Sequence, residues 1–145
     1  MKLLDGSVGF LLARTARSMK RALEARLSEY NITATQYIVL SLLSEEDGIS
    51  LSKLGRRLYF DNPTITGIVD RMERDGLVER RRVADDRRGI NVFLTQKGKQ
   101  LLGIIETFAE DINDQAMSEF TKSDRDKFVI TLDSIWKKMN GKVSH

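Results

Sequence analysis

The arginines near the middle of the sequence are the residues best suited to binding an anionic partner. Runs of arginine stand at 80–82 and 87–88, and Asp85 and Asp86 directly precede the second run. Guanidinium groups bind phosphates by charge-assisted hydrogen bonds, and a neighbouring carboxylate can hold such a group in one orientation. The pattern favours a polyanion, above all a nucleic acid, as the partner. A solvated basic loop with weak ion pairs is the competing interpretation.

The distribution of charge places the basic excess in one part of the chain. The 145 residues carry 24 Lys and Arg against 21 Asp and Glu, a net charge of +3. Residues 1–52 are neutral, residues 53–99 carry +5 and residues 100–145 carry −2. The length predicts a single domain spanning 1–145.

Several kinds of chemistry lack the residues that they need. The sequence has no cysteine, and its single histidine is His145, so we expect no disulfide, thiolate metal site, cysteine redox switch or Ser–His–Asp triad. Glu106, Glu110 and Asp114 stand at the i, i+4 and i+8 positions that are typical of a solvated helix face. We therefore expect no enzyme, no metal and no cofactor.

The hydropathy of the chain predicts no association with a membrane. No apolar run approaches the roughly 18 residues that a transmembrane helix needs. The first residues do not resemble a signal peptide, because they lack an apolar segment. We expect a cytoplasmic protein with no membrane partner.

Apolar spacing predicts the elements that must position the arginines. Steps of three or four residues indicate a helix over about 7–29 that stops at Asn31, and further helices over about 32–43, 50–58 and 63–75. Period-two segments indicate strands over 77–83 and 90–94. One long helix is predicted from 96 to about 117, and a last helix carries residues 128–139. The fold class is thus mainly α with a small β-hairpin.

Short polar signals predict where these helices begin and end. Thr33, Ser50 and Thr95 fit N-caps, and Asn62 fits an N-cap with Pro63 at the first helical position. Gly76 fits a left-handed C-terminal residue. Residues 123–126 resemble a capping box in which Asp replaces the usual Glu or Gln.

The helix over 63–75, followed by the hairpin, fits the arrangement of a winged helix-turn-helix. With Ile65, Ile68, Val69 and Met72 facing inward, Thr64, Gly67, Arg71 and Arg74 face outward, and Thr66 and Asp70 lie on the flank. Such a polar face can enter the major groove of DNA. An ordinary amphipathic surface helix would have the same face. The charged hairpin tip favours DNA, because an arginine there can enter a narrow minor groove.

Four stretches of the chain resemble the MarR-type transcriptional regulators. They are residues 32–40, 51–58, 63–80 and 85–95, and the resemblance extends over almost the whole chain. The family's wing carries an Asp-x-Arg pattern, which counting back from Leu94 places at Asp86-x-Arg88. Asp85-x-Arg87 is the alternative register.

The resemblance implies a homodimer that binds pseudo-palindromic double-stranded DNA and usually represses genes near its own. It implies a winged helix lobe over about 32–95 and dimerisation helices over about 7–30 and 96–140. Arg88 matches the minor-groove arginine and Asp86 its orienting carboxylate. The candidate DNA-binding residues are Ser52, Lys53, Asn62, Pro63, Thr64, Thr66, Gly67, Arg71, Arg74, Asp86, Arg87 and Arg88.

Apolar residues on the outer helices support the dimer independently. A winged helix lobe cannot cover all of them, and a monomer would expose a patch larger than a few hundred Å². An intramolecular helical bundle is the alternative. The candidate interface residues are Val8, Leu12, Leu23, Ile112, Phe128, Leu132 and Trp136.

The resemblance also leaves open a small lipophilic or aromatic-acid effector between the dimer helices and the DNA-binding lobe. Tyr30 and Tyr37 are the candidate effector contacts, with Tyr59 and Phe60 as further aromatics, although packing in the core is the favoured role of each. Two other functions compete with a specific regulator. One is a non-specific architectural DNA-binding protein, and the other is a winged-helix adaptor that binds proteins.

Overall fold

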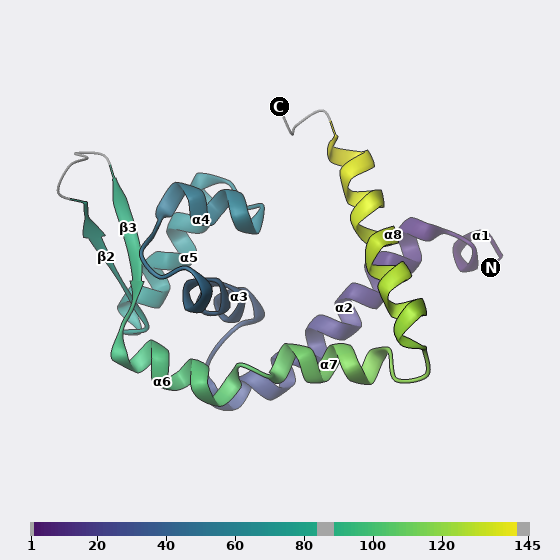
Figure 1. Cartoon of the computed structure of the whole chain (residues 1–145), viewed down its shortest axis with the longest axis horizontal. Helices are drawn as coiled ribbons and strands as arrows, with labels where there is room; N and C mark the ends of the chain where they lie inside the picture. Colours follow the sequence, from purple (N-terminus) through teal and green to yellow (C-terminus); the bar gives the residue numbers. More distant parts are fainter. Residues whose placement is uncertain (1, 84–88, 142–145) are drawn as a thin grey trace. The chain divides into compact units, whose positions relative to one another are not determined.

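The computed structural model describes residues 2–83 and 89–141, which form two compact units, 1–109 and 110–145. The fold is mainly helical with a small antiparallel sheet, as predicted (Figure 1). The first unit begins with α1 (Lys2–Asp5) and α2 (Val8–Leu27), which continues into the 3₁₀ turn η1 (Ser28–Tyr30). The remaining elements are α3 (Ala34–Glu45), β1 (Ile49–Ser50), α4 (Leu51–Leu58), α5 (Asn62–Arg74), β2 (Val78–Arg82), β3 (Ile90–Leu94), α6 (Gln96–Ile105), α7 (Phe108–Ala116) and α8 (Lys122–Asn140).

The sheet of the first unit has the strand order β1-β3-β2. The predicted hairpin is present, with Val78 opposite Leu94 and Arg82 opposite Ile90. The sequence analysis missed β1, because two residues are too few to show a period. Ile49 pairs with Val92, so β1 joins the hairpin to the segment between α3 and α4.

The core of this unit lies between α3, α4, α5 and the sheet. The apolar side of α5 is fully buried, as its spacing predicted, and α3 buries residues on most of its sides. The largest of the fully buried side chains are Leu27, Leu40, Leu43, Leu54, Ile65, Met72 and Ile105. Replacing one such leucine by alanine typically costs about 2–5 kcal/mol.

The helix caps confirm some predictions and correct two. The Thr33 hydroxyl accepts from Gln36 N while Gln36 Oε1 accepts from Thr33 N, which is a complete capping box. At α5 the N-cap is Asp61 and not Asn62, because the Asp61 carboxylate accepts from Thr64 N at 2.8 Å. A carboxylate suits the positive end of a helix better than an amide. Pro63 therefore occupies the second helical position.

The cap of α8 also differs from the prediction. Thr121 is the N-cap, and its hydroxyl accepts from Asp124 N at 3.1 Å. The predicted capping box at 123–126 is therefore wrong, since its first residue already lies within the helix. At the other predicted termini, Asn31 (φ 56°) and Gly76 (φ 77°) have the left-handed conformation.

The long helix predicted from 96 to 117 is two helices. α6 ends at Ile105 and α7 begins at Phe108. The side chain of Tyr37, on α3, bonds to the backbone on either side of the break: its hydroxyl donates to Glu106 O (2.9 Å), just after α6, and accepts from Ala109 N (3.2 Å), in the first turn of α7. A side chain thus satisfies backbone groups at the break. Apolar periodicity alone could not reveal it.

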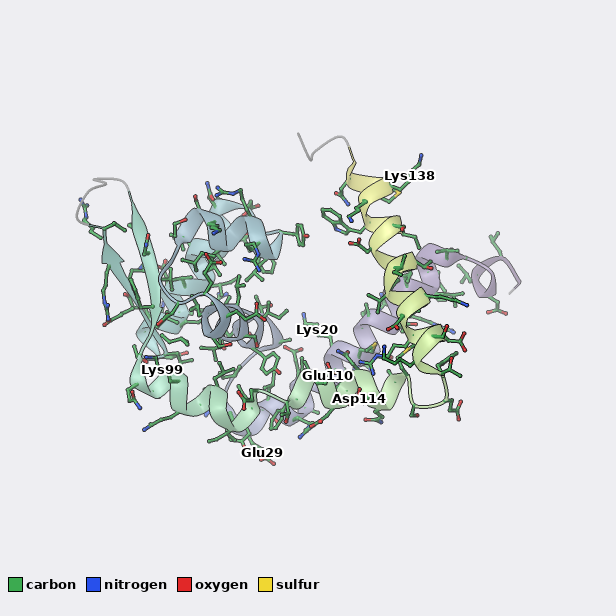
Figure 2. All side chains as sticks on the ribbon, viewed as in Figure 1. Lys20, Glu29, Lys99, Glu110, Asp114 and Lys138 are labelled. Atoms are coloured by element: carbon green, nitrogen blue, oxygen red, sulfur yellow. The ribbon has the colours of Figure 1, made fainter. Side chains whose placement is uncertain are left out.

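The second unit contains most of α7 and the whole of α8. Arg125 on α8 pairs with Glu110 (3.0 Å) and Asp114 (2.7 Å). Figure 2 labels these two acidic residues on α7. These two carboxylates therefore hold an arginine, which agrees with their interpretation as a solvated helix face. Neither α7 nor α8 has a buried residue. Within the described ranges, no helix is long and apolar enough to cross a bilayer.

Candidate nucleic-acid interface

Helix α5 presents the polar face that the sequence predicted. Ile65, Ile68, Val69 and Met72 are buried, whereas Thr64, Arg71 and Arg74 are exposed and Gly67 is half-buried. Thr66 and Asp70 lie on the flank, and Asn62 and Pro63 form an exposed first turn. A Cβ built at Gly67 meets no atom within 4 Å, so the surface of α5 is open at this position and has no side chain there. The arrangement matches what a helix needs to lie in a groove of DNA.

The two arginines of this face are free to bind an anion. Neither Arg71 nor Arg74 forms an ion pair with another residue in the described part of the chain. Both lie in the last turn of α5, and Arg71 is one helical turn from Gly67. An exposed guanidinium in this position can reach either a guanine edge or a phosphate.

Arg80, by contrast, is used inside the protein. Its Nη1 lies 2.6 Å from Asp70 Oδ1, and its Nε and Nη2 donate to Glu73 Oε1 at 3.1 and 2.9 Å. The Arg80 backbone N–H donates to the second Glu73 oxygen at 2.8 Å. Only 28% of the Arg80 side chain is exposed. The first arginine of the run at 80–82 therefore joins β2 to α5 and contributes less to the outer charge than the sequence suggested.

This ion pair makes the stability depend on pH. Hydrogen bonds from Arg80, first from its backbone N–H and then from its side chain, lower the pKa of Glu73 below its ordinary value of 4.5. Because the folded pKa is the lower one, the stabilisation is complete above the unfolded value and is lost as the pH falls through the folded value. Urea unfolding should therefore show a steeper loss of free energy below about pH 4.5 for the wild type than for Glu73→Gln. Equal slopes would show that the Glu73–Arg80 ion pair does not cause the pH dependence of stability.

Further contacts fix the base of the hairpin. Asn91 Nδ2 donates to Gly48 O at 2.7 Å, and Leu94 N donates to Asp47 Oδ1 at 2.8 Å. Arg81 lies over the Phe93 ring at 4.3 Å and pairs with Glu79. The Val83 N–H donates to Gly89 O at 3.2 Å, which closes the described part of the hairpin. The predicted wing residues Asp85, Asp86, Arg87 and Arg88 lie outside the described residues.

The predicted DNA contacts of α4 are exposed but already have partners. Lys53 Nζ lies 2.8 Å from Glu46, which also pairs with Arg57 at 3.1 Å. These contacts lower the pKa of Glu46, chiefly through the hydrogen bond from Lys53. The Ser52 hydroxyl accepts from Arg56 at 3.3 Å. A phosphate would therefore have to compete with Glu46 for Lys53.

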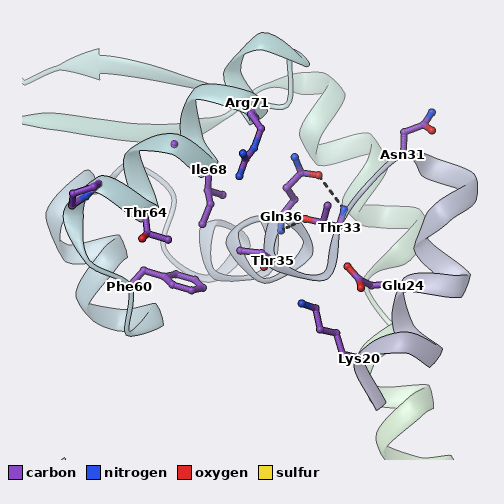
Figure 3. A pocket seen from close by; sticks show the side chains of 12 residues that line it. Lys20, Glu24, Asn31, Thr33, Thr35, Gln36, Phe60, Thr64, Ile68 and Arg71 are labelled. Carbon is purple, nitrogen blue, oxygen red and sulfur yellow. Dashed lines mark hydrogen bonds between the residues drawn. The ribbon is translucent and has the colours of Figure 1, made fainter. Parts of the chain in front are cut away.

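A cavity of about 690 Å³ opens between α2, the start of α3 and the polar side of α5 (Figure 3). Lys20 and Glu24 line it from α2, and Thr64 and Arg71 line it from α5. The Thr33–Gln36 capping box forms part of its wall. Sequence reasoning missed Lys20, Glu24 and Gln36, since nothing in their spacing relates them to residues 60–71.

Comparisons with known proteins agree with this geometry. A sequence profile of the MarR family matches residues 32–90. The organic hydroperoxide resistance transcriptional regulator of Bacillus subtilis is 37% identical over 98 residues, which cover 68% of this chain and 67% of that protein. The chain belongs to the MarR family.

Other relatives of this MarR-family chain are consistent with that assignment. The HTH-type transcriptional regulator TtmR of Methylorubrum extorquens is 38% identical over 100 residues, which cover 69% of this chain but only 51% of TtmR. The S. aureus MepR–DNA complex superposes with a TM-score of 0.87 over 91% of this chain and 98% of that chain. At 21% identity, the superposition shows a shared fold. The relatives are named as regulators of transcription and not as enzymes.

The candidate effector residues of the MarR-family chain, Tyr30 and Tyr37, both lie beside the α6–α7 break, and neither lines the cavity at α5. Tyr37 is buried (4% exposed) and its hydroxyl bonds to the α6–α7 break. The Tyr30 ring lies 6.0 Å from that of Phe108. Phe60 lines the cavity at α5, whereas Tyr59 is largely exposed. An effector contact by Tyr30 or Tyr37 stays a prediction.

The candidate dimer residues are distributed over both units. In the first unit Val8 is exposed, Leu12 is half-buried and Leu23 packs partly against the core. In the second unit Phe128 and Trp136 are exposed, and Ile112 and Leu132 are half-buried. Met139, and Ile130, which the sequence analysis did not name, are more exposed than Phe128 and Trp136.

Proposed function

We propose that this MarR-type regulator binds a pseudo-palindromic operator as a homodimer and represses the genes beside it. Helix α5 lies in the major groove, and Arg88 of the wing enters the adjacent minor groove. The observation that carries this proposal is the exposed face of α5, where Arg71 and Arg74 pair with no other described residue while Arg80 does. Two cations that stand on the outer face of a helix, and that pair with no other described residue, are available to the phosphates and base edges of DNA.

The assembly as a dimer is supported by the second unit. Neither of its helices has a buried residue, and Ile130 and Met139 are 65% and 79% exposed. A pair of helices without a buried side chain has no core of its own. A second copy of the chain would cover these apolar residues in a two-fold interface.

Size-exclusion chromatography with light scattering tests the dimer. We expect a mass of twice the 16.5 kDa of one chain at micromolar concentration. Replacing Ile130 and Met139 together by lysine should shift the mass toward that of one chain, because charged residues oppose burial of this face. A wild-type protein that elutes with the mass of one chain would contradict the dimer.

We also propose that a small effector molecule releases the protein from DNA. The cavity beside α5 carries two cations, Lys20 and Arg71, against one carboxylate, Glu24, which accepts a hydrogen bond from Ala34 N, and Phe60 adds an aromatic ring. This lining suits a small aromatic acid, whose carboxylate would pair with a cation and whose ring would stack on Phe60. Because Arg71 also belongs to the DNA-binding face, an acid that occupies this cavity would compete with DNA for it.

The wing gives the experiment that tests this DNA-bound geometry. Arg88→Ala should weaken operator binding and make the slope of log affinity against log salt less negative by about 1. The reason is that one cation that neutralises DNA phosphates is lost. The circular dichroism spectrum should stay unchanged. Arg87→Ala is the matched control, since it removes the same charge from the neighbouring position.

Either substitution can contradict part of the proposal. A larger effect of Arg87→Ala than of Arg88→Ala would move the wing to the alternative register, Asp85-x-Arg87. Unchanged affinity in both variants would contradict the proposed contact between the wing and DNA.

A further inference from the structure

The junction between α6 and α7 is held by one buried hydroxyl group. Tyr37 lies in the core of the first unit, and its hydroxyl has two partners in the junction, Glu106 O and Ala109 N. A phenol can donate one hydrogen bond and can also accept hydrogen bonds at its oxygen. The Tyr37 hydroxyl does both, since it donates to Glu106 O and accepts from Ala109 N. The residue that donates to it, Ala109, is the last residue of the first unit.

Two ring contacts surround the same junction. The Tyr30 ring lies against Phe108, with centroids 6.0 Å apart, and the Arg26 guanidinium lies 3.9 Å over the same Phe108 ring. These contacts place the Phe108 side chain but do not bond to the backbone. Among the side chains with hydrogen bonds assigned in the described ranges, the Tyr37 hydroxyl alone bonds to the backbone on both sides of the break.

We propose that Tyr37 is a positioning residue whose hydroxyl fixes the direction in which the chain leaves the winged helix lobe. Its ring belongs to α3, which packs against α5 and β3 in the lobe. Its hydroxyl holds the backbone from which the helices of the second unit continue. The inference rests on the proposed function: in a dimer assembled through these helices, this direction sets the spacing between the two α5 helices.

The expected consequence is a loss of discrimination between operator spacings. A rigid dimer matches half-sites about one helical turn apart and should bind poorly when base pairs are inserted between them. Tyr37→Phe keeps the ring and removes the hydroxyl, so Glu106 O and Ala109 N lose their partner. We expect the ratio of affinities for the best and the worst spacing to fall by about 2- to 30-fold.

Matched variants separate positioning from mere stability. Tyr30→Phe removes the same atom from a ring at the same junction, where the hydroxyl has no hydrogen bond to another described residue. Ile105→Val weakens the buried core of α6 and leaves the Tyr37 hydroxyl in place. Both should keep the wild-type spacing ratio.

The probe is a duplex selected from random DNA by the wild-type protein, with up to about half a turn inserted between its half-sites. A reduced ratio in Tyr37→Phe alone supports the inference. An unchanged ratio in Tyr37→Phe, or an equal reduction in Ile105→Val, overturns it. If the wild type selects no specific duplex, the proposed function fails, and amide exchange then decides on Tyr37.

Amide hydrogen exchange tests the hydroxyl without DNA. The Ala109 amide should exchange slowly in the wild type and in Tyr30→Phe, and faster in Tyr37→Phe, while the amides of α3 keep their protection. A fast Ala109 amide in the wild-type protein overturns the inference, whatever the protein binds.

Discussion

Arg71→Ala is expected to weaken binding to the operator by about 10- to 100-fold, or about 1–3 kcal/mol. The Arg71 guanidinium is exposed on the polar face of α5 and pairs with no other described residue, so its removal disturbs no internal contact. Stability should therefore change by less than about 0.5 kcal/mol. Fluorescence anisotropy on operator and random duplexes measures the affinity, and urea unfolding measures the stability.

The comparison of two duplexes assigns the role of Arg71. A loss confined to the operator indicates a base contact, whereas an equal loss on random DNA indicates a phosphate contact. Lys122→Ala is the control, because it removes the same charge from α8, where the lysine is 91% exposed. If Lys122→Ala weakens binding as much as Arg71→Ala, net charge and not the α5 face carries the affinity.

Gly98→Ala is expected to be the most damaging small substitution for the fold. Gly98 lies in the first turn of α6, and a Cβ there would overlap the carbonyl oxygen of Leu77, which also accepts from Thr95 N. Because the overlap is with backbone, the start of α6 must move away from the strand that leads into the wing. We expect a loss of about 1–3 kcal/mol, or more if the strand cannot yield.

Gly103 offers a control within the same helix. A Cβ at this position meets no atom within 4 Å, and alanine is the better helix former. Gly103→Ala should therefore raise the free energy of unfolding by up to about 1 kcal/mol. Urea denaturation of both variants measures the difference, and a Gly98→Ala protein as stable as the wild type would contradict the close packing of α6 on Leu77.

The local features of this fold were predictable where short-range rules decide them. The inner side of α5, from Ile65 to Met72, follows from a 3.6-residue period. The left-handed residues at Asn31 and Gly76 follow from residue type. The N-cap of α5 was misplaced by one residue, because Asp61 and Asn62 are both good caps, and the preference of proline for the first helical position favoured Asn62.

The long-range features could not be predicted in the same way. Tyr37 bonds to Glu106 and Ala109, some 70 residues along the chain, and an apolar stripe runs through the break that it stabilises. In the sequence Arg80 belongs to a basic run, which suggests a free charge. Its partners Asp70 and Glu73 come close to it only when β2 packs against α5. Charge counted along a sequence therefore overstates the charge that is free to bind DNA.

Binding to DNA from upstream of the protein's own gene tests the central claim most directly. Fluorescence anisotropy would be measured with excess random competitor at two salt concentrations. A site-specific regulator should stay bound despite the competitor and bind more weakly at the higher salt, since phosphate contacts release counterions. Complete loss to the competitor would indicate a non-specific architectural binder. Absence of binding at low salt would contradict the DNA-binding role of α5 and favour a protein partner instead.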